Sequence, residues 1–317
     1  MAARRALVVT GHLQVSQEVE QALAAKAAVV ALESTIIAHG FPYPESLSVA
    51  QVLHEAVRDE GSVPAMIAIV RGEVRIGLDD EATELIARGD DVEKCGVADI
   101  AAVCARGADG ATTVSASITL AAQAGIEVFA TGGLGGVHRH HGGGDAPADI
   151  SADLLALSRT PIAVVSSGAK MLLDLPATVE ALETLGVPVL GYRTTHFPAF
   201  YLSSSGIPLR HSFDNVAGLA SAIQCQREMG ALSGILVCNP PPDDVALGPE
   251  ELERWVEQAL AEANRDGIVG SDVTPYVLDA LHRLSAGRTV VCNKDLAREN
   301  AAVAGRLAHA LTIPEVQ

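Results

Sequence analysis

Apolar positions along the chain gather in short continuous runs that are typical of buried strands. Amphipathic segments of helical length separate these runs. Buried strands that alternate with helices are typical of a parallel sheet covered on both faces. The pattern therefore predicts an α/β protein, a single-domain α/β/α layered fold with a central, mostly parallel sheet. The expected strands are residues 29–32, 63–70, 126–130, 162–166, 189–192 and 234–238. The expected helices are residues 16–27, 49–60, 79–88, 99–105, 178–185, 215–229 and 249–266, with another starting at Pro275.

The pattern also predicts finer features at the edges of this framework. Residues 63–70 and the alternating residues 73–77 should pair as a hairpin at the sheet edge. Near the C-terminus we expect a short strand over residues 289–292, ending at Asn293, and a last helix over residues 295–311. No glycine- and serine-rich linker or internal repeat divides the chain. We therefore expect an N-terminal extension (residues 1–15) and one domain (residues 16–317).

Composition narrows the classes of partner and compartment. The formal charge of −17 argues against a nucleic-acid polymer, which needs a basic surface, but allows a small phosphorylated ligand. The longest apolar runs have strand length, too short to cross a bilayer, and the N-terminus has too short an apolar core for a signal peptide. Five scattered cysteines, none in a C-x-x-C pair, argue against a disulfide framework. We expect a cytoplasmic protein without a membrane partner.

The richest stretch for chemistry is residues 129–174. A strand enters a loop with seven glycines, which carries His138, His140 and His141 and closes on the segment D-I-S-A-D, residues 149–153. A second strand then ends in Ser-Gly-Ala-Lys, residues 167–170. Ligand sites of parallel sheets form where strands end. The stretch therefore predicts a polar ligand site at this edge.

Familiar fingerprints do not explain the glycine loop. It lacks the last glycine of G-x-G-x-x-G and is followed by further loop, and no Walker A motif occurs anywhere in the chain. The histidines lack further ligands at zinc spacing, so solvated loop histidines are the better interpretation. Asp149 and Asp153, with Ser151 between them, suit a hard cation such as Mg²⁺ or Mn²⁺ held by one carboxylate and several waters.

Glu33 directly follows the strand at residues 29–32 and lies between two apolar runs. Apolar surroundings favour the protonated carboxyl group, which is what a general acid requires. A plain turn-capping role explains the residue equally well.

Lys170 admits a catalytic and a structural interpretation. It follows a buried strand and precedes apolar residues, and partial desolvation favours the neutral, nucleophilic amine. A lysine that reaches solvent at a helix start is the alternative. Lys94 lies in an expected loop, where a single lysine is usually an ordinary surface residue. The segment from residue 110 to 115, at an expected helix start, is open to anion binding or ordinary capping.

With these residues in place, the sequence resembles the pseudouridine-5'-phosphate glycosidase family, which includes the indigoidine-cluster A proteins. The likeness covers roughly residues 16–311. It rests on ordered blocks: VVALESTIIAHG, VPAMIAIV, GATTVSA, VFATGGLGGVHR, DISADL, GAK, LGVPVLGYRT and VTPYVL.

The resemblance implies cleavage of the C–C bond between uracil and ribose 5-phosphate, with Mn²⁺ (or Mg²⁺), by an α/β/α protein that assembles as a homotrimer. It assigns the nucleophile to Lys170, the proton donor to Glu33 and the metal aspartate to Asp149. Addition of Lys170 to C1′ would open the sugar to an imine, an electron sink that lets uracil depart. The residues it implies for substrate binding are Lys94, Val114, Thr113, Thr131, His138, Ser151, Ala152, Asp153 and Asn293.

The chain departs from the family pattern around these residues. Val97-Ala98 replaces a basic pair, the loop between His138 and Asp149 looks longer, and Asn293 is followed by a lysine instead of a second asparagine. These changes affect the expected identity of the aglycone more than they affect the expected binding of the ribose phosphate. A C-glycosynthase that joins ribose 5-phosphate to an aromatic acceptor is therefore the closest alternative, and a non-catalytic phosphosugar-binding protein is a third.

Overall fold

A computed structural model describes residues 13–139, 149–268 and 273–313. His140 and His141 lie outside the described residues. The strands are β1 (Leu13–Val15), β2 (Val29–Leu32), β3 (Val63–Val70), β4 (Glu73–Ile76), β5 (Glu93–Cys95), β6 (Gly110–Thr112), β7 (Val128–Ala130), β8 (Ala163–Ser166), β9 (Val189–Tyr192), β10 (His211–Phe213) and β11 (Ile235–Cys238). The helices are α1 (Gln17–Ala24), α2 (Thr35–His39), α3 (Glu45–Arg58), α4 (Asp80–Arg88), α5 (Ile100–Arg106), α6 (Val114–Ala124), α7 (Ala152–Arg159), α8 (Leu175–Thr184), α9 (Val216–Glu228), α10 (Pro249–Arg265), α11 (Val273–Leu284) and α12 (Arg288–Thr312).

The strands form one sheet in the order β1-β4-β3-β2-β7-β8-β11-β9-β10, with β6 also pairing with β3, and β5 with β6. Every pairing is parallel except β3 with β4 and β3 with β6, which confirms the mostly parallel sheet. The predicted β3–β4 hairpin forms, but β1 pairs outside β4 and takes the edge of the sheet. Residues 13–15, which the sequence grouped with the N-terminal extension, therefore belong to the sheet.

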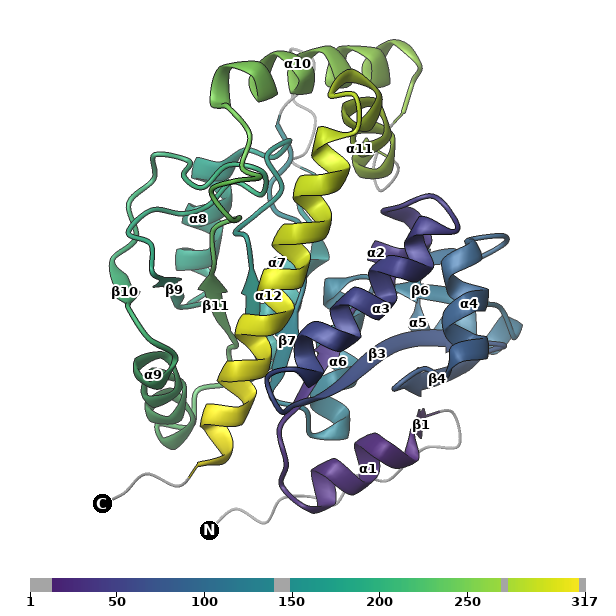
Figure 1. Cartoon of the computed structure of the whole chain (residues 1–317), viewed down its shortest axis with the longest axis vertical. Helices are drawn as coiled ribbons and strands as arrows, with labels where there is room; N and C mark the ends of the chain where they lie inside the picture. The colour runs from purple at the N-terminus through teal and green to yellow at the C-terminus, as the bar shows by residue number, and fades with distance from the viewer. Residues whose placement is uncertain (1–12, 140–148, 269–272, 314–317) are drawn as a thin grey trace.

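Helices cover both faces of the sheet (Figure 1). The long helix α12 runs diagonally across one face over β7, β2 and β8, between α3 and α9, while α6 and α7 pack together on the opposite face. Helices α10 and α11 pack against each other at the end of the molecule where α12 begins. This arrangement confirms the α/β/α layers. None of the described helices is both long and apolar enough to cross a membrane.

Two segments adopt a different structure from the one that the sequence predicts. Residues 289–292 form the first turn of α12 instead of a strand. Thr289, Cys292, Leu296 and Asn300 are all buried, so the apolar pattern continues at helical spacing, whereas Val291 is 56% exposed. Lys94 lies in β5, paired beside Ala111 of β6, and not in a loop. The residues flanking it give only a short, mixed pattern, too weak to indicate a strand.

Candidate active site

Glu33 is placed by the carboxyl end of β2. Its side chain is buried, with the residue 9% exposed, and its two carboxylate oxygens accept hydrogen bonds from the hydroxyls of Thr35 and Thr131. The neighbouring Ser34 is bonded to the end of β6: the Thr112 backbone N–H donates to Ser34 Oγ at 2.9 Å. Strands β2, β6 and β7 thus meet at Glu33, and its carboxyl group is held in one orientation.

Lys170 is placed by a tight turn after β8. Gly168 has φ +68°, and a Cβ there would lie 2.1 Å from the Pro198 carbonyl oxygen, so only glycine fits. The backbone N–H of Lys170 donates to Leu134 O at 3.1 Å, and Leu134 N–H donates to Gly168 O at 2.9 Å. These bonds join the lysine turn to the glycine loop after β7. The Lys170 side chain is half-buried and borders the cavities described below.

Asp153 organises the backbone around the glycine loop. The residue is 6% exposed, and its carboxylate accepts from Ser115 N–H and from Gly135 N–H, each at 2.9 Å. A Cβ at Gly135 would lie 2.3 Å from Ser151 Oγ, so glycine allows this approach. Ser151 caps α7 by accepting from Asp153 N–H at 3.2 Å. Asp153 therefore ties the start of α6 to the loop, a role that its spacing from Asp149 did not indicate.

Asp149 differs from Asp153 in its surroundings. It is exposed, and its backbone carbonyl accepts from His138 N–H at 2.9 Å, which holds it beside the glycine loop. Among the described residues, no group of three or more His, Cys, Asp or Glu side chains is arranged to hold a metal. The exposed Asp149 carboxylate could supply one oxygen ligand to a hard cation, which would have to take its other ligands from water or substrate.

The start of α6 provides small and hydroxyl residues facing the same space. Thr113 is the N-cap residue, and its Oγ1 lies 2.9 Å from Ser115 Oγ. Val114 opens the helix beside it. Backbone N–H groups at a helix start favour an anion.

Two adjoining cavities collect all the predicted site residues. The first, of about 280 Å³, has polar walls that include Thr113, Val114, Ser115, Gly135, His138, Asp149, Ser151, Ala152 and Asp153. The second, of about 70 Å³, is more apolar and is lined by residues that include Ile36, His39, Thr131, Gly132, Gly133, Phe200, Pro275, Leu278 and Asn293. Both are bordered by Glu33, Thr35, Lys94, Lys170 and Thr274. The carboxyl group and the amine thus stand at the junction of a polar and an apolar compartment.

Sequence reasoning missed several wall residues. Thr35 is the last residue of the A-L-E-S-T block, and its hydroxyl, two residues after Glu33, was a signal in the sequence that could have identified it. Thr274, Pro275 and Leu278 come from α11, more than a hundred residues after Lys170. They lie in the V-T-P-Y-V-L block of the resemblance, but the block does not indicate which part of the fold it contacts. Phe200 lies in the segment between β9 and β10, and a Cβ at Gly133 would be 2.6 Å from its ring.

Two titratable side chains near the site are held uncharged. Burial, and secondarily the charge of Lys94, lowers the pKa of His39. Burial raises the pKa of Cys292, next to Asn293, to about 12. Cys292 therefore remains a thiol near neutral pH and does not compete with Lys170 as a nucleophile.

Similar proteins share this architecture over nearly the whole chain. The profile of the family described as "Indigoidine synthase A like protein" matches residues 18–310. The chain is 47% identical over 94% of its length to pseudouridine-5'-phosphate glycosidase of Paracoccus denitrificans, covering 98% of that protein. It is 46% identical to the protein of the same name from Symbiobacterium thermophilum, over 94% of this chain and 97% of the other.

Two solved structures have the same fold over nearly the whole chain. The prealnumycin C-glycosynthase AlnA, solved in complex with ribulose 5-phosphate, superposes with a TM-score of 0.87 at 39% identity, over 96% of this chain and 98% of that one. An indigoidine synthase A (IdgA)-like protein from Thermotoga maritima superposes with a TM-score of 0.85 at 34% identity, over 95% and 97% of the two chains. The family match over residues 18–310 and the relatives at 46–47% identity over 94% of the chain show that the chain belongs to the indigoidine synthase A-like family.

Proposed function

We propose that this protein is a C-glycosidase that breaks the bond between uracil and ribose 5-phosphate in pseudouridine 5'-phosphate. The observation that carries the proposal is the position of Glu33 and Lys170, which border both the polar and the apolar compartment. A substrate with a charged sugar phosphate and a flat base would fill one compartment with each half. Its glycosidic carbon would then lie beside the acid and the amine. The names of the curated relatives support this substrate.

The reaction begins with opening of the sugar ring. Glu33 gives its proton to the ring oxygen O4′ as the C1′–O4′ bond breaks, and Lys170 Nζ forms a bond to C1′. The Thr35 and Thr131 hydroxyls, which donate to the two carboxylate oxygens of Glu33, hold this group in one orientation. Proton donation and nucleophilic attack are thus assigned to two groups with fixed positions.

The C–C bond breaks in the second stage. The Lys170 nitrogen supplies its electron pair to form a C=N bond to C1′, and uracil leaves with the electron pair of the C1′–C5 bond. Before this bond breaks, Lys170 Nζ loses the extra proton that it carries after the addition and C5 takes a proton, so the electron pair of the C1′–C5 bond restores the C5=C6 double bond of uracil. Water then hydrolyses the imine, which frees ribose 5-phosphate and restores the amine.

The polar compartment would bind the sugar phosphate. Thr113, Val114 and Ser115 at the start of α6, and Ser151 and Ala152 at the start of α7, border it. The helix starts, Lys94 and Lys170 would attract the phosphate, whereas the carboxylates of Asp99, Asp149 and Asp153 in the same walls oppose it. A divalent cation such as Mn²⁺, held at Asp149 with waters, would neutralise further negative charge on the substrate oxygens. In the apolar compartment, Asn293 and Thr131 offer polar contacts to the base.

The assay that tests the proposal is uracil release from pseudouridine 5'-phosphate in the presence of Mn²⁺. We expect turnover by the wild type and none by Lys170→Ala, because that variant has lost the nucleophile. Lys26→Ala, which changes a lysine at the end of α1, is the matched control and should release uracil at the wild-type rate. A folded wild-type protein without turnover would contradict the assignment.

The reverse direction is the second candidate. A C-glycosynthase would form the same lysine imine from ribose 5-phosphate and add an electron-rich aromatic carbon to it. The likeness to AlnA, at 39% identity, favours this chemistry. The direction is tested by incubating the protein with ribose 5-phosphate and either uracil or a polyketide-type aromatic acceptor. Product with the aromatic acceptor and none with uracil would favour the synthase.

The assembly and the compartment are proposals as well. We propose a homotrimer in the cytoplasm, in keeping with the family resemblance and with the scattered cysteines.

A further inference from the structure

One fully buried side chain of α12 holds the ends of the central strands together. Asn300 is 0% exposed. Its side-chain Nδ2 donates to Thr131 O at 2.8 Å, to Gly132 O at 3.3 Å and to Ser167 Oγ at 3.2 Å. Its Oδ1 accepts from Asn239 Nδ2 at 2.9 Å. The two donor hydrogens and the acceptor oxygen of this amide are thus all used inside the protein core.

The groups that Asn300 contacts belong to the strand ends that carry the acid and the amine. Thr131, directly after β7, donates its hydroxyl to Glu33. Ser167, directly after β8, lies three residues before Lys170. Asn239, directly after β11, also donates its backbone N–H to Ser166 O at 2.9 Å. One amide therefore connects the Glu33 side of the site with the Lys170 side.

These contacts add to the backbone bonds between β7 and β8. Thr131 N–H donates to Val165 O at 3.1 Å, and Ser167 N–H donates to Gly132 O at 2.9 Å. Past these bonds the glycine loop and the lysine turn are joined again, by Leu134 N–H to Gly168 O at 2.9 Å and by Lys170 N–H to Leu134 O at 3.1 Å. The Asn300 amide lies between these two sets of backbone bonds, and it adds side-chain contacts to both segments at Thr131, Gly132 and Ser167.

The helix that carries Asn300 is a rigid support. Helix α12 packs against α3, α9 and the strands β2, β7 and β8. Asn293, seven residues earlier on the same helix face, borders the apolar compartment. A buried polar network is stabilising only when every member is bonded, and this one fixes a single arrangement of the strand ends.

We propose that Asn300, supported by Asn239, is a positioning residue that sets the separation between the Glu33 carboxyl group and the Lys170 amine. The inference rests on the proposed function, in which both groups act on the same sugar carbon. Asn300 acts through the backbone and Thr131 and does not touch the substrate. A small displacement of reacting groups, of about 1 Å, can cost roughly a hundredfold in rate.

The test measures kcat, KM and imine formation for Asn300→Ala and Asn239→Ala. Imine formation is followed by trapping the adduct of ribose 5-phosphate with borohydride, which reduces the C=N bond to a stable amine. We expect kcat and the trapping rate to fall by about tenfold to a hundredfold for Asn300→Ala, with KM much less affected. Asn239→Ala removes only one contact of the same amide, so we expect this variant to stay folded and its kcat and trapping rate to fall less.

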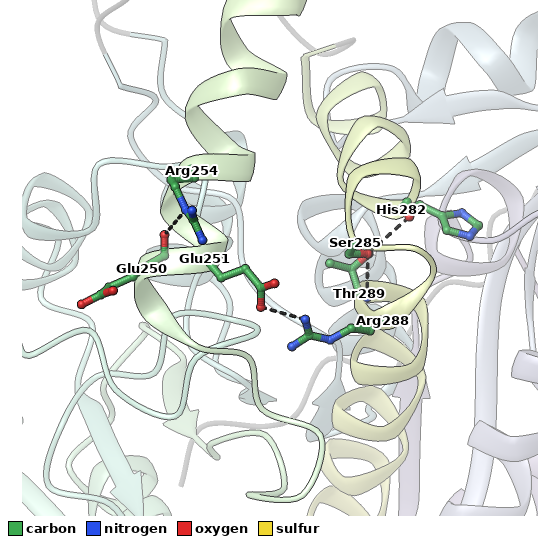
Figure 2. A network of polar contacts seen from close by, with 7 residues as sticks. All are labelled: Glu250, Glu251, Arg254, His282, Ser285, Arg288 and Thr289. Atoms are coloured by element: carbon green, nitrogen blue, oxygen red, sulfur yellow. Dashed lines mark hydrogen bonds and ion pairs between the residues drawn. The ribbon is translucent and has the colours of Figure 1, made fainter.

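Thr289→Ala is the matched control for loss of a buried side-chain bond on the same helix. Thr289 is 1% exposed, and its Oγ1 lies 3.0 Å from Ser285 Oγ, in the contact drawn in Figure 2, away from the strand ends. We expect Thr289→Ala to lower the melting temperature while kcat and the trapping rate stay at the wild-type values. A merely structural role for Asn300 would give the same result in its variant.

The outcomes separate this proposal from the one on which it rests. Wild-type values of kcat and trapping rate in folded Asn300→Ala, or in Asn239→Ala should the first variant not fold, would overturn the positioning role alone. A wild type that neither releases uracil nor forms the adduct would contradict the proposed function and remove the premise for the positioning role. Reduced trapping in both asparagine variants, beside an unchanged Thr289→Ala, would support the proposal.

Discussion

At the residue scale, the carboxylates of the site differ in their hydrogen-bond partners and in their exposure to water. Glu33 has exchanged water for the hydroxyls of Thr35 and Thr131, and Asp153 has exchanged it for two backbone N–H groups. Asp149 is left exposed. Carboxylates with different surroundings perform different tasks, and here these would be proton transfer, backbone organisation and metal binding.

Removal of either hydroxyl that faces Glu33 should slow the reaction. A hydrogen bond to a charged group is worth about 1.5–3 kcal/mol, which corresponds to roughly a tenfold to hundredfold fall in kcat for Thr131→Val or Thr35→Val. Steady-state kinetics of uracil release provides the measurement. Thr119→Val is the control, because its hydroxyl donates to Ser115 O within α6. Equal kcat in all three variants would rule out a role of the hydroxyls.

His39 should make the protein less stable in acid. Its pKa is lowered in the folded state, by burial first and then by Lys94, so the unfolded chain takes up a proton at a higher pH than the folded one. The free energy of unfolding is unaffected above about pH 6.5 and falls as the pH drops below it. His39→Gln should flatten this decline in urea titrations between about pH 7 and pH 5. His309→Gln is the control, and an identical decline in wild type and His39→Gln would contradict the account.

At the scale of elements, strand ends and helix starts create the site. The ends of β2, β7 and β8 deliver Glu33, Thr131 and Lys170, and the starts of α6 and α7 face the polar compartment. Short strands are enough to place these residues, because backbone hydrogen bonds between neighbouring strand ends fix the distance between the ends. The glycines between them allow close approach, as at Gly135 beside Ser151.

Asp153 and Asp149 should respond differently to the same substitution. Asp153→Asn loses charge-assisted acceptance from the start of α6 and the glycine loop, so the free energy of unfolding should fall by about 1–3 kcal/mol. Asp149→Asn should leave stability nearly unchanged and raise the Mn²⁺ concentration needed for half-maximal activity. Urea unfolding and metal titration after chelation test the pair. A metal requirement that shifts only in Asp153→Asn would reverse the two assignments.

Sequence patterns revealed most elements because the buried runs are long or strongly periodic. The strand Val63–Val70 and the helix expected over residues 16–27 are examples, and the structure shows Ser16 capping that helix by accepting from Val19 N–H at 3.4 Å. The start of α12 was misjudged since its first turn, T-V-V-C, carries β-branched residues that favour strands. Packing of the whole helix on the sheet overrides that local preference.

The candidate site was foreseen where its residues lie in compact motifs and missed where tertiary contact brings them in. Glu33, Lys170 and Asp149 lie at strand ends or in the glycine-rich stretch, so the sequence marked them as candidates, and the family resemblance gave them their expected roles. Leu278 and Asn300 are helical residues whose partners are distant in sequence. Nothing in the local pattern reports a contact across the sheet.

At the scale of the whole molecule, α10 and α11 form a cap at one end of the sheet, and ion pairs join it to the body. Arg288 at the start of α12 bonds Glu251 of α10 at 2.7 Å (Figure 2). Arg139 bonds Glu253 of α10 at 2.7 Å and also donates to Met171 O and Leu173 O, just after Lys170. The cap, the glycine loop and the lysine turn are thus connected by one guanidinium.

Arg139→Ala should therefore weaken substrate binding more than a surface ion pair alone would. We expect kcat/KM to fall by about tenfold, since the carbonyls of the lysine turn lose their donors and the cap loses its link. Arg139→Lys should restore little of it, because a lysine cannot donate in a fixed fork. Arg283→Ala, which breaks an ion pair within the cap to Glu262, is the control. Full activity of Arg139→Ala would contradict this connection.

The central claim is that Lys170 forms an imine with ring-opened ribose 5-phosphate. Its most direct test is borohydride reduction of the wild-type protein with ribose 5-phosphate, followed by peptide mass spectrometry. The account predicts one reduced ribose 5-phosphate adduct per chain, located on Lys170 and absent without borohydride. An adduct on another lysine, such as Lys94, or no adduct in a protein that releases uracil, would contradict it.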